Sequence, residues 1–224
     1  MDNIIKNYSV IVFDVGGTLM EYSGMPLSWV NYYPQGFKFV SENFHLNLSD
    51  DAIKKSVAVM TEFNPRINYR ESEIPPEEIF TEATKHWNTV VELNEIIATF
   101  FKGLSLKATI FDYSLPVIDF FKNKGLAVGL LTDLPCGMPD ELFKAQIDTL
   151  VNSCDFYISS QSCGYRKPNP RGVQIASNIC AVTTDKIIMI GDEEKDRLTA
   201  KNACCGFMNI ENFRTIFQDK KYLK

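Results

Sequence analysis

Hydrophobic residues form short uninterrupted runs at the start of the chain and throughout its second half. The first run, at 9–13, is rich in β-branched residues, and four similar runs follow residue 125. Continuous apolar runs of this length are typical of strands buried on both faces of a parallel sheet. The pattern therefore predicts five strands: SVIVF at 9–13, LAVGLL at 126–131, FYIS at 156–159, KIIMI at 186–190 and GFMNI at 206–210.

The segments between the later strands have helical periodicity. Within 115–124 and 139–151, apolar residues recur mostly at intervals of three or four, at Val117, Phe120, Phe121, Leu142, Phe143, Ile147 and Leu150. Strands that alternate with helices of this length predict βαβ units. We therefore expect an α/β fold built on a doubly wound, mostly parallel sheet.

Residues 26 to about 111 show a different pattern, a succession of helices with no convincing strand between them. Ser49 suits the N-cap of one helix, and Pro75 and Pro76 suit the start of another. The expected apolar faces are Phe37, Val40 and Phe44, then Ile53, Val57 and Met60, then Ile79, Ala83, Trp87 and Val90, with a fourth helix at 94–104. These helices predict an all-helical domain at 23–111, inserted into an α/β core formed by 1–22 and 112–224.

The composition narrows the class of protein. The chain has 224 residues, 45% of them hydrophobic, and 23 basic against 28 acidic residues give a net charge of −5. This is the composition of a globular protein, and it lacks the basic excess of a broad nucleic-acid-binding surface. No apolar stretch approaches the ~20 residues that a membrane span needs. We therefore expect neither a nucleic-acid nor a membrane partner.

The cysteines and the N-terminal residues predict a cellular compartment. The six cysteines form no CxxC pair, and the apolar run that starts at Val10 stops at Asp14, too soon for a signal peptide. Free thiols without an export signal are typical of a reducing compartment. We therefore expect a cytoplasmic protein.

Polar residues follow three of the predicted strands at their carboxyl ends, the edge at which open α/β sheets bind ligands. Asp14 follows the first strand, Thr132 and Asp133 follow the second, and Asp192 follows the fourth, with Asp196 one helical turn later. Three carboxylates that meet at one edge would repel one another and raise one another's pKa. A divalent cation and a lysine would relieve that repulsion.

The loop GYRKPNP at 164–170 offers the lysine, Lys167. Taken singly, each of these residues also has a structural explanation. Asp14 could cap a turn, Asp192 could cap a helix beginning at Glu193, Lys167 could be a solvated loop charge, and Thr132 could bond its own backbone. A functional interpretation therefore depends on several motifs together.

Four segments, in order, resemble the motifs of the haloacid dehalogenase-like superfamily, which is dominated by phosphatases with an aspartate nucleophile. DVGGTL at 14–19 matches motif one, LLTD at 130–133 matches motif two, Lys167 in RKPNP matches motif three, and GDEEKD at 191–196 matches motif four. The resemblance covers 9–19 and about 112–210, and it implies a Rossmann-like core. The inserted helical domain resembles the family's C1 cap, which occupies the same place.

The resemblance implies a Mg²⁺ site and an aspartyl-phosphate intermediate. Asp14 would attack the phosphorus of a small phosphorylated substrate, and water would then hydrolyse the intermediate. The carboxylates of Asp14 and Asp192 and the backbone carbonyl of Gly16 would hold Mg²⁺. Asp196 would be a further ligand or would orient one.

The resemblance also implies which residues bind the phosphoryl group. Lys167 would neutralise Asp14 and the phosphoryl oxygens, and the Thr132 hydroxyl would donate to them. The remaining contacts implied with the substrate come from Val15, Gly16 and the backbone amide of Asp133.

One position departs from the family pattern. Most phosphatases of the family have a second aspartate two residues after the nucleophile, which acts as general acid and base; this chain has Gly16 there. Candidate replacements are Glu21, His45 and His86. In the predicted cap, NPRINYR at 64–70 offers Arg66, Tyr69 and Arg70 for an anionic part of the substrate.

Two alternative functions stay open at this point. A phosphonatase, which cleaves a C–P bond, also lacks the second aspartate, but it needs a cap lysine, and none of Lys38, Lys54, Lys55 and Lys85 has a sequence setting that singles it out. A binding or regulatory protein with weak catalysis could also use this fold. The sequence leaves the substrate and the oligomeric state open.

Overall fold

The computed structural model describes residues 6–218, in two compact units. One unit contains Met1–Glu21, Ala108–Asp133 and Lys144–Lys224, and the other contains Tyr22–Lys107 and Leu134–Phe143. The ends of the predicted core, at 1–5 and 219–224, lie outside the described residues. The boundaries predicted from sequence, with the helical domain at 23–111, stay a prediction. We call the first unit the core unit and the second the helical unit.

The core unit contains a five-stranded sheet. Its strands are β5 (Phe156–Ser159), β4 (Ala127–Thr132), β1 (Val10–Phe13), β6 (Ile187–Gly191) and β7 (Gly206–Asn209), in that spatial order and all parallel. Each lies within one residue of the hydrophobic run that predicts it, so the predicted α/β fold with a parallel sheet is confirmed. The central strand β1 pairs Phe13 with Leu130 of β4 and with Ile190 of β6, so these three strands end together.

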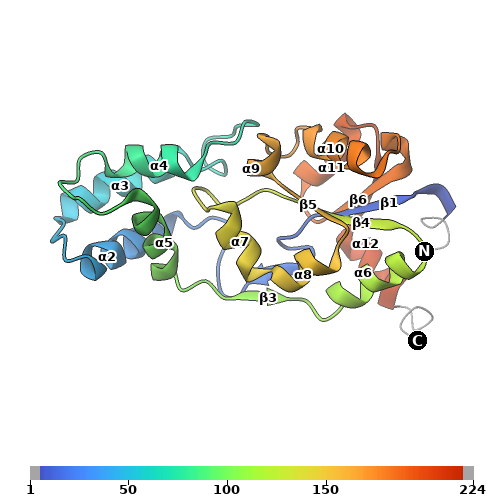
Figure 1. Ribbon diagram of the computed structural model, residues 1–224, viewed down its shortest axis with the longest axis horizontal. Helices are drawn as coiled ribbons and strands as arrows, with labels where there is room; N and C mark the ends of the chain where they lie inside the picture. Colours follow the sequence, from blue (N-terminus) through green and yellow to red (C-terminus); the bar gives the residue numbers. More distant parts are fainter. Residues whose placement is uncertain (1–5, 219–224) are drawn as a thin grey trace. The chain divides into compact units, whose positions relative to one another are not determined.

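Helices cover both faces of this sheet (Figure 1). On one face, Val10 and Val12 belong to a buried cluster with Val173 of α10 (Arg171–Cys180) and Ala200 of α11 (Glu194–Asn202). On the other, Phe13 packs against α6 (Ser114–Asn123) and α12 (Ile210–Gln218), with ring centroids 6.4 Å from Phe121 and 5.9 Å from Phe213. Short elements complete the unit: α8 (Asp148–Ser153), α9 (Ser160–Cys163) and the 3₁₀ helix η2 (Thr184–Lys186).

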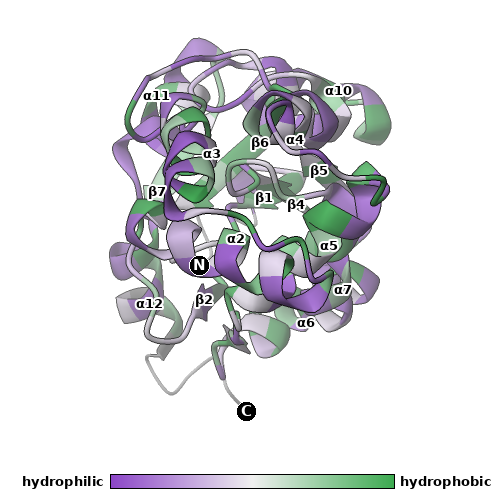
Figure 2. Cartoon of the chain, turned by 90° about the vertical axis from the view of Figure 1, so that its left-hand side faces the viewer, coloured by the Kyte–Doolittle hydropathy of each residue, from purple (hydrophilic) through white to green (hydrophobic). Residues whose placement is uncertain are grey.

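The helical unit is built around aromatic side chains. Its elements are the 3₁₀ helix η1 (Val30–Tyr32), α2 (Tyr33–Asn43), α3 (Asp50–Glu62), α4 (Pro76–Thr84) and α5 (Leu93–Gly103). Phe37, Phe80 and Phe100 pack with ring centroids 4.7–6.2 Å apart, and all three are fully buried. The predicted N-cap at Ser49 is confirmed, since its Oγ accepts the Ala52 amide at 3.2 Å. Helix α3 carries hydrophilic and hydrophobic residues side by side (Figure 2), as expected for a helix with one buried face.

Three details of the sequence analysis were wrong. Helix α4 ends at Thr84, and Val90, assigned to its apolar face, is 98% exposed. The predicted helix at 139–151 is two helices, α7 (Asp140–Gln146) and α8, because Ile147 between them has non-helical backbone angles while its side chain stays buried. The apolar spacing continues through the break, so periodicity alone cannot reveal it.

The third detail is a second, two-stranded sheet. Strands β2 (Met20–Tyr22) and β3 (Ala108–Ile110) pair with each other, although the sequence analysis found no strand between 26 and 111. The amide of Phe111 donates to the Leu19 carbonyl at 3.0 Å, and the amide of Ser23 donates to the Lys107 carbonyl at 2.9 Å. Three residues are too few to show an alternating pattern, so only the pairing identifies these strands.

A buried hydroxyl joins two helices of the helical unit and provides a stability test. Ser56 of α3 donates to the Ala83 carbonyl at 2.7 Å and accepts from Trp87 Nε1 at 3.0 Å. We expect Ser56→Ala to lower the free energy of unfolding by about 1–3 kcal/mol, because it leaves a buried indole N–H without an acceptor.

Urea denaturation measures this loss. Thr61→Ala is the matched control, since the Thr61 hydroxyl donates only within α3, to the Val57 carbonyl at 2.7 Å. Its loss should be about 0.5 kcal/mol or less. Equal losses for the two variants would show that the bond between α3 and α4 contributes nothing of its own.

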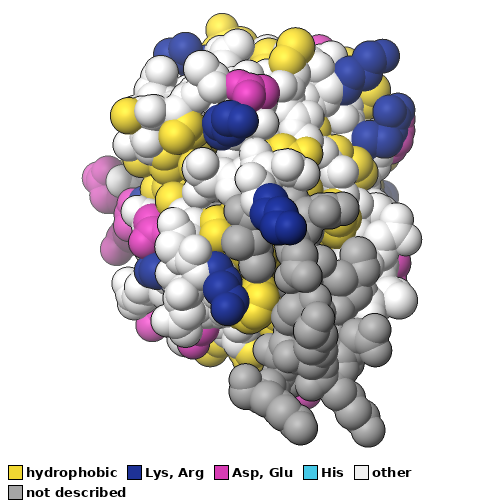
Figure 3. Space-filling model, turned by 90° about the vertical axis from the view of Figure 1, so that its right-hand side faces the viewer, with side chains coloured by type: hydrophobic (Ala, Val, Ile, Leu, Met, Phe, Trp, Pro, Cys, Tyr) yellow, Lys and Arg dark blue, Asp and Glu magenta, His cyan; other side chains and the backbone are white. Residues whose placement is uncertain are grey.

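Within residues 6–218, no helix combines the length and the apolar character that a membrane crossing requires. The face of the molecule shown in Figure 3 carries basic and acidic side chains interspersed with one another rather than gathered by sign.

Candidate functional site

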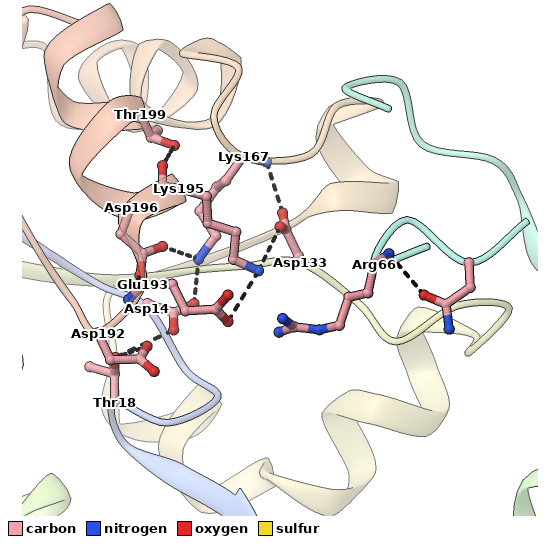
Figure 4. A network of polar contacts seen from close by, with 11 residues as sticks. Asp14, Thr18, Arg66, Asp133, Lys167, Asp192, Glu193, Lys195, Asp196 and Thr199 are labelled. Carbon is pink, nitrogen blue, oxygen red and sulfur yellow. Dashed lines mark hydrogen bonds and ion pairs between the residues drawn. The ribbon is translucent and has the colours of Figure 1, made fainter. Parts of the chain in front are cut away.

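The functional candidates of the core unit gather where β1, β4 and β6 end together. Asp14 directly follows β1, Asp133 follows β4 and Asp192 follows β6. From β1, the sheet continues through β4 and β5 on one side, and the later strands β6 and β7 lie on the other side of β1. Open α/β sheets bind ligands in the crevice at such a reversal of strand order. Lys167 reaches the same place from the loop between α9 and α10 (Figure 4).

Lys167 is a buried cation held between two carboxylates. Its Nζ donates to Asp14 Oδ1 and, at 2.6 Å, to Asp196 Oδ1. Lys167 is 4% exposed and Asp196 is fully buried. The alternative that Lys167 is a solvated loop charge is therefore wrong, because the side chain has exchanged water for two ion pairs.

Three carboxylates lie close enough to share one cation. Asp14, Asp192 and Asp196 each offer an oxygen, and these oxygens lie within 4.8 Å of one another. The Thr18 hydroxyl lies 3.3 Å from Asp14 Oδ2 and 3.2 Å from Asp192 Oδ1, so it links the first two. Carboxylate oxygens are the ligands that hard divalent cations such as Mg²⁺ prefer. The residues present therefore fit such an ion.

Glycine at position 17 lets Asp192 approach the backbone. Gly17 has φ +79°, and a Cβ there would lie 2.3 Å from Asp192 Oδ2. Gly16 differs, because a Cβ on it would meet no atom within 4 Å. Of these two glycines, only Gly17 is thus required by the packing against Asp192.

Asp196 also shapes the start of α11. Its Oδ2 accepts the Glu193 amide at 3.0 Å, and the Glu193 side chain accepts a backbone amide of the first turn in return, forming a capping box. The N-cap is therefore Glu193, and the alternative that Asp192 caps this helix is wrong. Because Glu193 caps the helix, the Asp192 carboxylate is not engaged in capping and lies in the carboxylate cluster.

Burial and charge act in opposite directions on the ionisation of this cluster. Burial raises the pKa of the Asp14 carboxyl, and Lys167 opposes that shift. Burial also raises the pKa of Asp192, and the charge of Asp196 adds to the effect. Burial by itself would lower the pKa of Lys167, but Asp14 and Asp196 outweigh it and raise that pKa above its usual range. Lys167 therefore stays charged, while the carboxylates are crowded in a way that a further cation would relieve.

A second lysine, which the sequence analysis did not single out, lies at the same edge. Lys195 Nζ is 3.1 Å from Asp133 Oδ2 and 3.5 Å from Glu193 Oε1 (Figure 4). The other Asp133 oxygen, Oδ1, accepts the backbone amide of Lys167 at 2.9 Å. Burial raises the pKa of Asp133, but Lys195, Lys167 and Arg166 outweigh it and lower that pKa to about 2. Asp133 is therefore a charged carboxylate with both oxygens engaged.

The other predicted contacts of the phosphoryl group lie at the ends of β1 and β4. Thr132 ends β4 and is 3% exposed. The side chain of Val15 is fully buried, and its carbonyl accepts the amides of Thr18, Leu19 and Met20. That turn shapes the backbone around Gly16. Substrate contacts by these residues stay a prediction.

Three of the polar candidates outside this cluster, Arg70, Tyr69 and His86, have partners in the helical unit. Arg70 is mostly buried in the helical unit, where its Nη1 donates to the Phe63 carbonyl, and Tyr69 Oη donates to Glu71 Oε1 at 2.9 Å. His86 Nε2 lies 2.9 Å from the Ala52 carbonyl. His45, His86, Glu21 and Arg66 are exposed. Their predicted roles, as replacement acids or in binding an anion, stay predictions.

Comparison with known protein families identifies the chain. A family model described as haloacid dehalogenase-like hydrolase matches residues 8–203, which contain the strands β1 and β4–β6 and all four motifs. The chain belongs to the haloacid dehalogenase-like hydrolases. No curated protein matches it significantly.

Solved structures share this hydrolase fold at low sequence identity. One is a haloacid dehalogenase family enzyme from Bacteroides thetaiotaomicron, solved with magnesium and inorganic phosphate: 16% identity, TM-score 0.55, 90% of this chain and 93% of the other. Another is a candidate β-phosphoglucomutase from Thermotoga maritima, which is 13% identical with a TM-score of 0.54. The match covers 94% of this chain and 99% of the other. A third is CbbY from Rhodobacter sphaeroides in complex with phosphate, which is 13% identical with a TM-score of 0.53. The match covers 90% of this chain and 85% of the other. These likenesses show the fold.

Proposed function

We propose that this hydrolase is a Mg²⁺-dependent phosphatase that acts on a small phosphorylated metabolite through an aspartyl-phosphate intermediate. The observation that carries the proposal is the buried Lys167, whose ammonium contacts Asp14 and Asp196 at the carboxyl edge of the sheet. A carboxylate nucleophile beside a fixed cation is what the attack on an anionic phosphoryl group requires.

The metal would be held by Asp14, Asp192 and the backbone carbonyl of Gly16. Asp196 would be a further ligand or would orient one, since its oxygens also accept hydrogen bonds from Lys167 and from the Glu193 amide. When bound, Mg²⁺ would offset the negative charge of the phosphoryl oxygens and of the carboxylates around them.

The proposed reaction has two chemical steps, formation and hydrolysis of an aspartyl-phosphate. Asp14 forms a bond to phosphorus while the ester P–O bond breaks, and the leaving oxygen takes a proton from solvent water. Water then attacks the phosphorus of the aspartyl-phosphate, which releases inorganic phosphate and restores the Asp14 carboxylate. Lys167 stabilises charge on the phosphoryl oxygens in both steps, and the Thr132 hydroxyl and the Asp133 amide position them.

Gly16 determines which leaving groups this site handles well. Proton transfer by a positioned acid is typically worth about 10²–10⁴-fold in rate, and glycine has no side chain to supply it. We therefore expect good turnover of aryl or acyl phosphates, whose leaving groups need little protonation, and slow turnover of alkyl phosphates.

A phosphatase assay tests the proposal directly. The purified protein is assayed against p-nitrophenyl phosphate, acetyl phosphate, sugar phosphates and nucleotides, with Mg²⁺ and with EDTA, beside Asp14→Asn. We expect Mg²⁺-dependent release of phosphate from the activated substrates by the wild type alone. Equal rates for wild type and Asp14→Asn on every substrate would contradict catalysis and favour a binding or regulatory role.

The helical unit gives the phosphonatase alternative little support. Lys38, Lys55 and Lys85 lie on its surface in ion pairs with Glu42, Asp51 and Glu82, and Lys54 is exposed too. A lysine that forms a Schiff base needs a desolvated amine. Release of phosphate from a phosphonate rather than from phosphate esters would reverse this preference.

A further inference from the structure

Lys195 lies at an unusual position for a lysine, in the first turn of α11. The N-terminus of a helix carries a partial positive charge, so a cation there is unfavourable unless it has another partner. Lys195 has one, because its Nζ lies 3.1 Å from Asp133 Oδ2, and its side chain is only 26% exposed. A residue that opposes the local preference of its helix while making a specific long-range contact indicates a role outside the helix.

Asp133 is unusual for a related reason. Its carboxylate lies beside Thr132, where the proposed function places an anionic phosphoryl group, and an uncompensated carboxylate there would repel that group. Its side chain is 6% exposed, and both oxygens point to cations or amides: Oδ2 to Lys195 and Oδ1 to the Lys167 amide at 2.9 Å. The negative charge of Asp133 is therefore balanced by groups of the protein itself.

These contacts join three segments that carry the site. Asp133 directly follows β4, Lys167 lies in the loop before α10, and Lys195 precedes Asp196 in α11. Lys167 must hold its ammonium between Asp14 and Asp196, so a shift of this loop would change both ion pairs, and a shift of α11 would change the pair with Asp196. Figure 4 shows the two lysines reaching the strand ends from these two segments.

We infer that Asp133 and Lys195 form a positioning pair that keeps the Lys167 ammonium in register with Asp14 and Asp196. The inference rests on the proposed phosphatase function and adds two residues that act through Lys167 rather than on the substrate. Lys195 also neutralises Asp133, so the phosphoryl group meets no net negative charge at the end of β4.

Steady-state kinetics on p-nitrophenyl phosphate with Mg²⁺ test the pair. We expect Lys195→Met and Asp133→Asn each to lower kcat by about 10- to 100-fold, since small displacements of catalytic groups have effects of that size. KM should rise by less than about threefold, because a displaced Lys167 ammonium weakens substrate binding much less than it slows the chemical step. The double variant should be no slower than the slower single variant, as for two residues that act as a unit. Lys195→Arg should recover most of the lost kcat.

The matched control is Arg197→Met on the same helix. Arg197 pairs with Glu194, and the two side chains are 50% and 64% exposed. This variant removes a cation and an ion pair from α11 outside the network, so its kcat should equal that of the wild type. If Lys195→Met and Asp133→Asn also keep kcat within about twofold of wild type, the positioning role is overturned while the phosphatase function stands.

Calorimetry with inorganic phosphate and Mg²⁺ gives a readout that does not need turnover. Removing the charge of Asp133 would by itself strengthen the binding of an anion, whereas displacing Lys167 would weaken it. We therefore expect Asp133→Asn to bind phosphate more weakly than wild type, and stronger or equal binding would overturn the inference. If Asp133→Asn fails to fold, Lys195→Met and Lys195→Arg carry the kinetic test.

The two proposals fail in different ways. A wild type as inactive as Asp14→Asn contradicts the phosphatase function, and the phosphate titration then decides whether the pair organises an anion site. A wild type that neither turns over phosphate esters nor binds phosphate overturns both.

Discussion

Replacing Lys167 by methionine is expected to lower kcat for phosphate esters by at least about 10³-fold, because the variant loses the fixed cation that faces both the nucleophile and the transferred group. The same change should destabilise the fold. It leaves Asp14 and Asp196 as buried carboxylates without their cation, and breaking a buried ion pair on one side costs about 3–5 kcal/mol.

The pH dependence of this loss distinguishes it from a packing defect. In Lys167→Met the buried carboxyls bind protons more tightly than the same groups in the unfolded chain, so the folded state holds more protons above about pH 4. Its stability relative to wild type should therefore fall as pH rises from about 5 to 8. Urea denaturation across this range measures the trend, and a loss that does not vary with pH would indicate packing alone.

Lys186→Met is the matched control for this experiment. Lys186 makes an exposed ion pair with Asp185, with Nζ 3.6 Å from Oδ2. Exposed pairs contribute about 0–1 kcal/mol, so this variant should keep wild-type kcat and nearly wild-type stability.

Restoring an acid at position 16 is expected to raise activity rather than lower it. Gly16→Asp should increase kcat for alkyl phosphates by about 10²–10⁴-fold, because a carboxylic acid beside the nucleophile can protonate a poor leaving group. The space exists, since a Cβ at Gly16 meets no atom within 4 Å. Turnover of p-nitrophenyl phosphate should change much less, because its leaving group needs little protonation.

Gly17→Ala is the contrasting variant. It places a Cβ against Asp192 at a residue with φ +79°, so we expect loss of activity on all substrates. Rates for alkyl and aryl phosphates, measured in parallel, separate the two cases. If Gly16→Asp leaves the alkyl phosphate rate unchanged or lowers it, then a missing acid is not what limits this enzyme.

The site was predictable where its residues follow a strand or belong to a motif. Asp14, Thr132, Asp133 and Asp192 can be found because a hydrophobic run ends just before each of them. Lys195 could not be found in this way. It stands in the charged run EEKD, which is typical of a solvated helix start, and its partner Asp133 is more than sixty residues earlier.

The sequence by itself determined the parallel sheet, the helices around it, the Ser49 cap and the presence of four family motifs, because strand burial, helix periodicity and capping depend on neighbouring residues. The tertiary structure decided which of these residues contact one another. The burial of Lys167 between two carboxylates, the two contacts of Asp133 and the β2–β3 pairing all join segments far apart in the chain. Such contacts leave no periodic signal, because they depend on where the folded strands end rather than on local spacing.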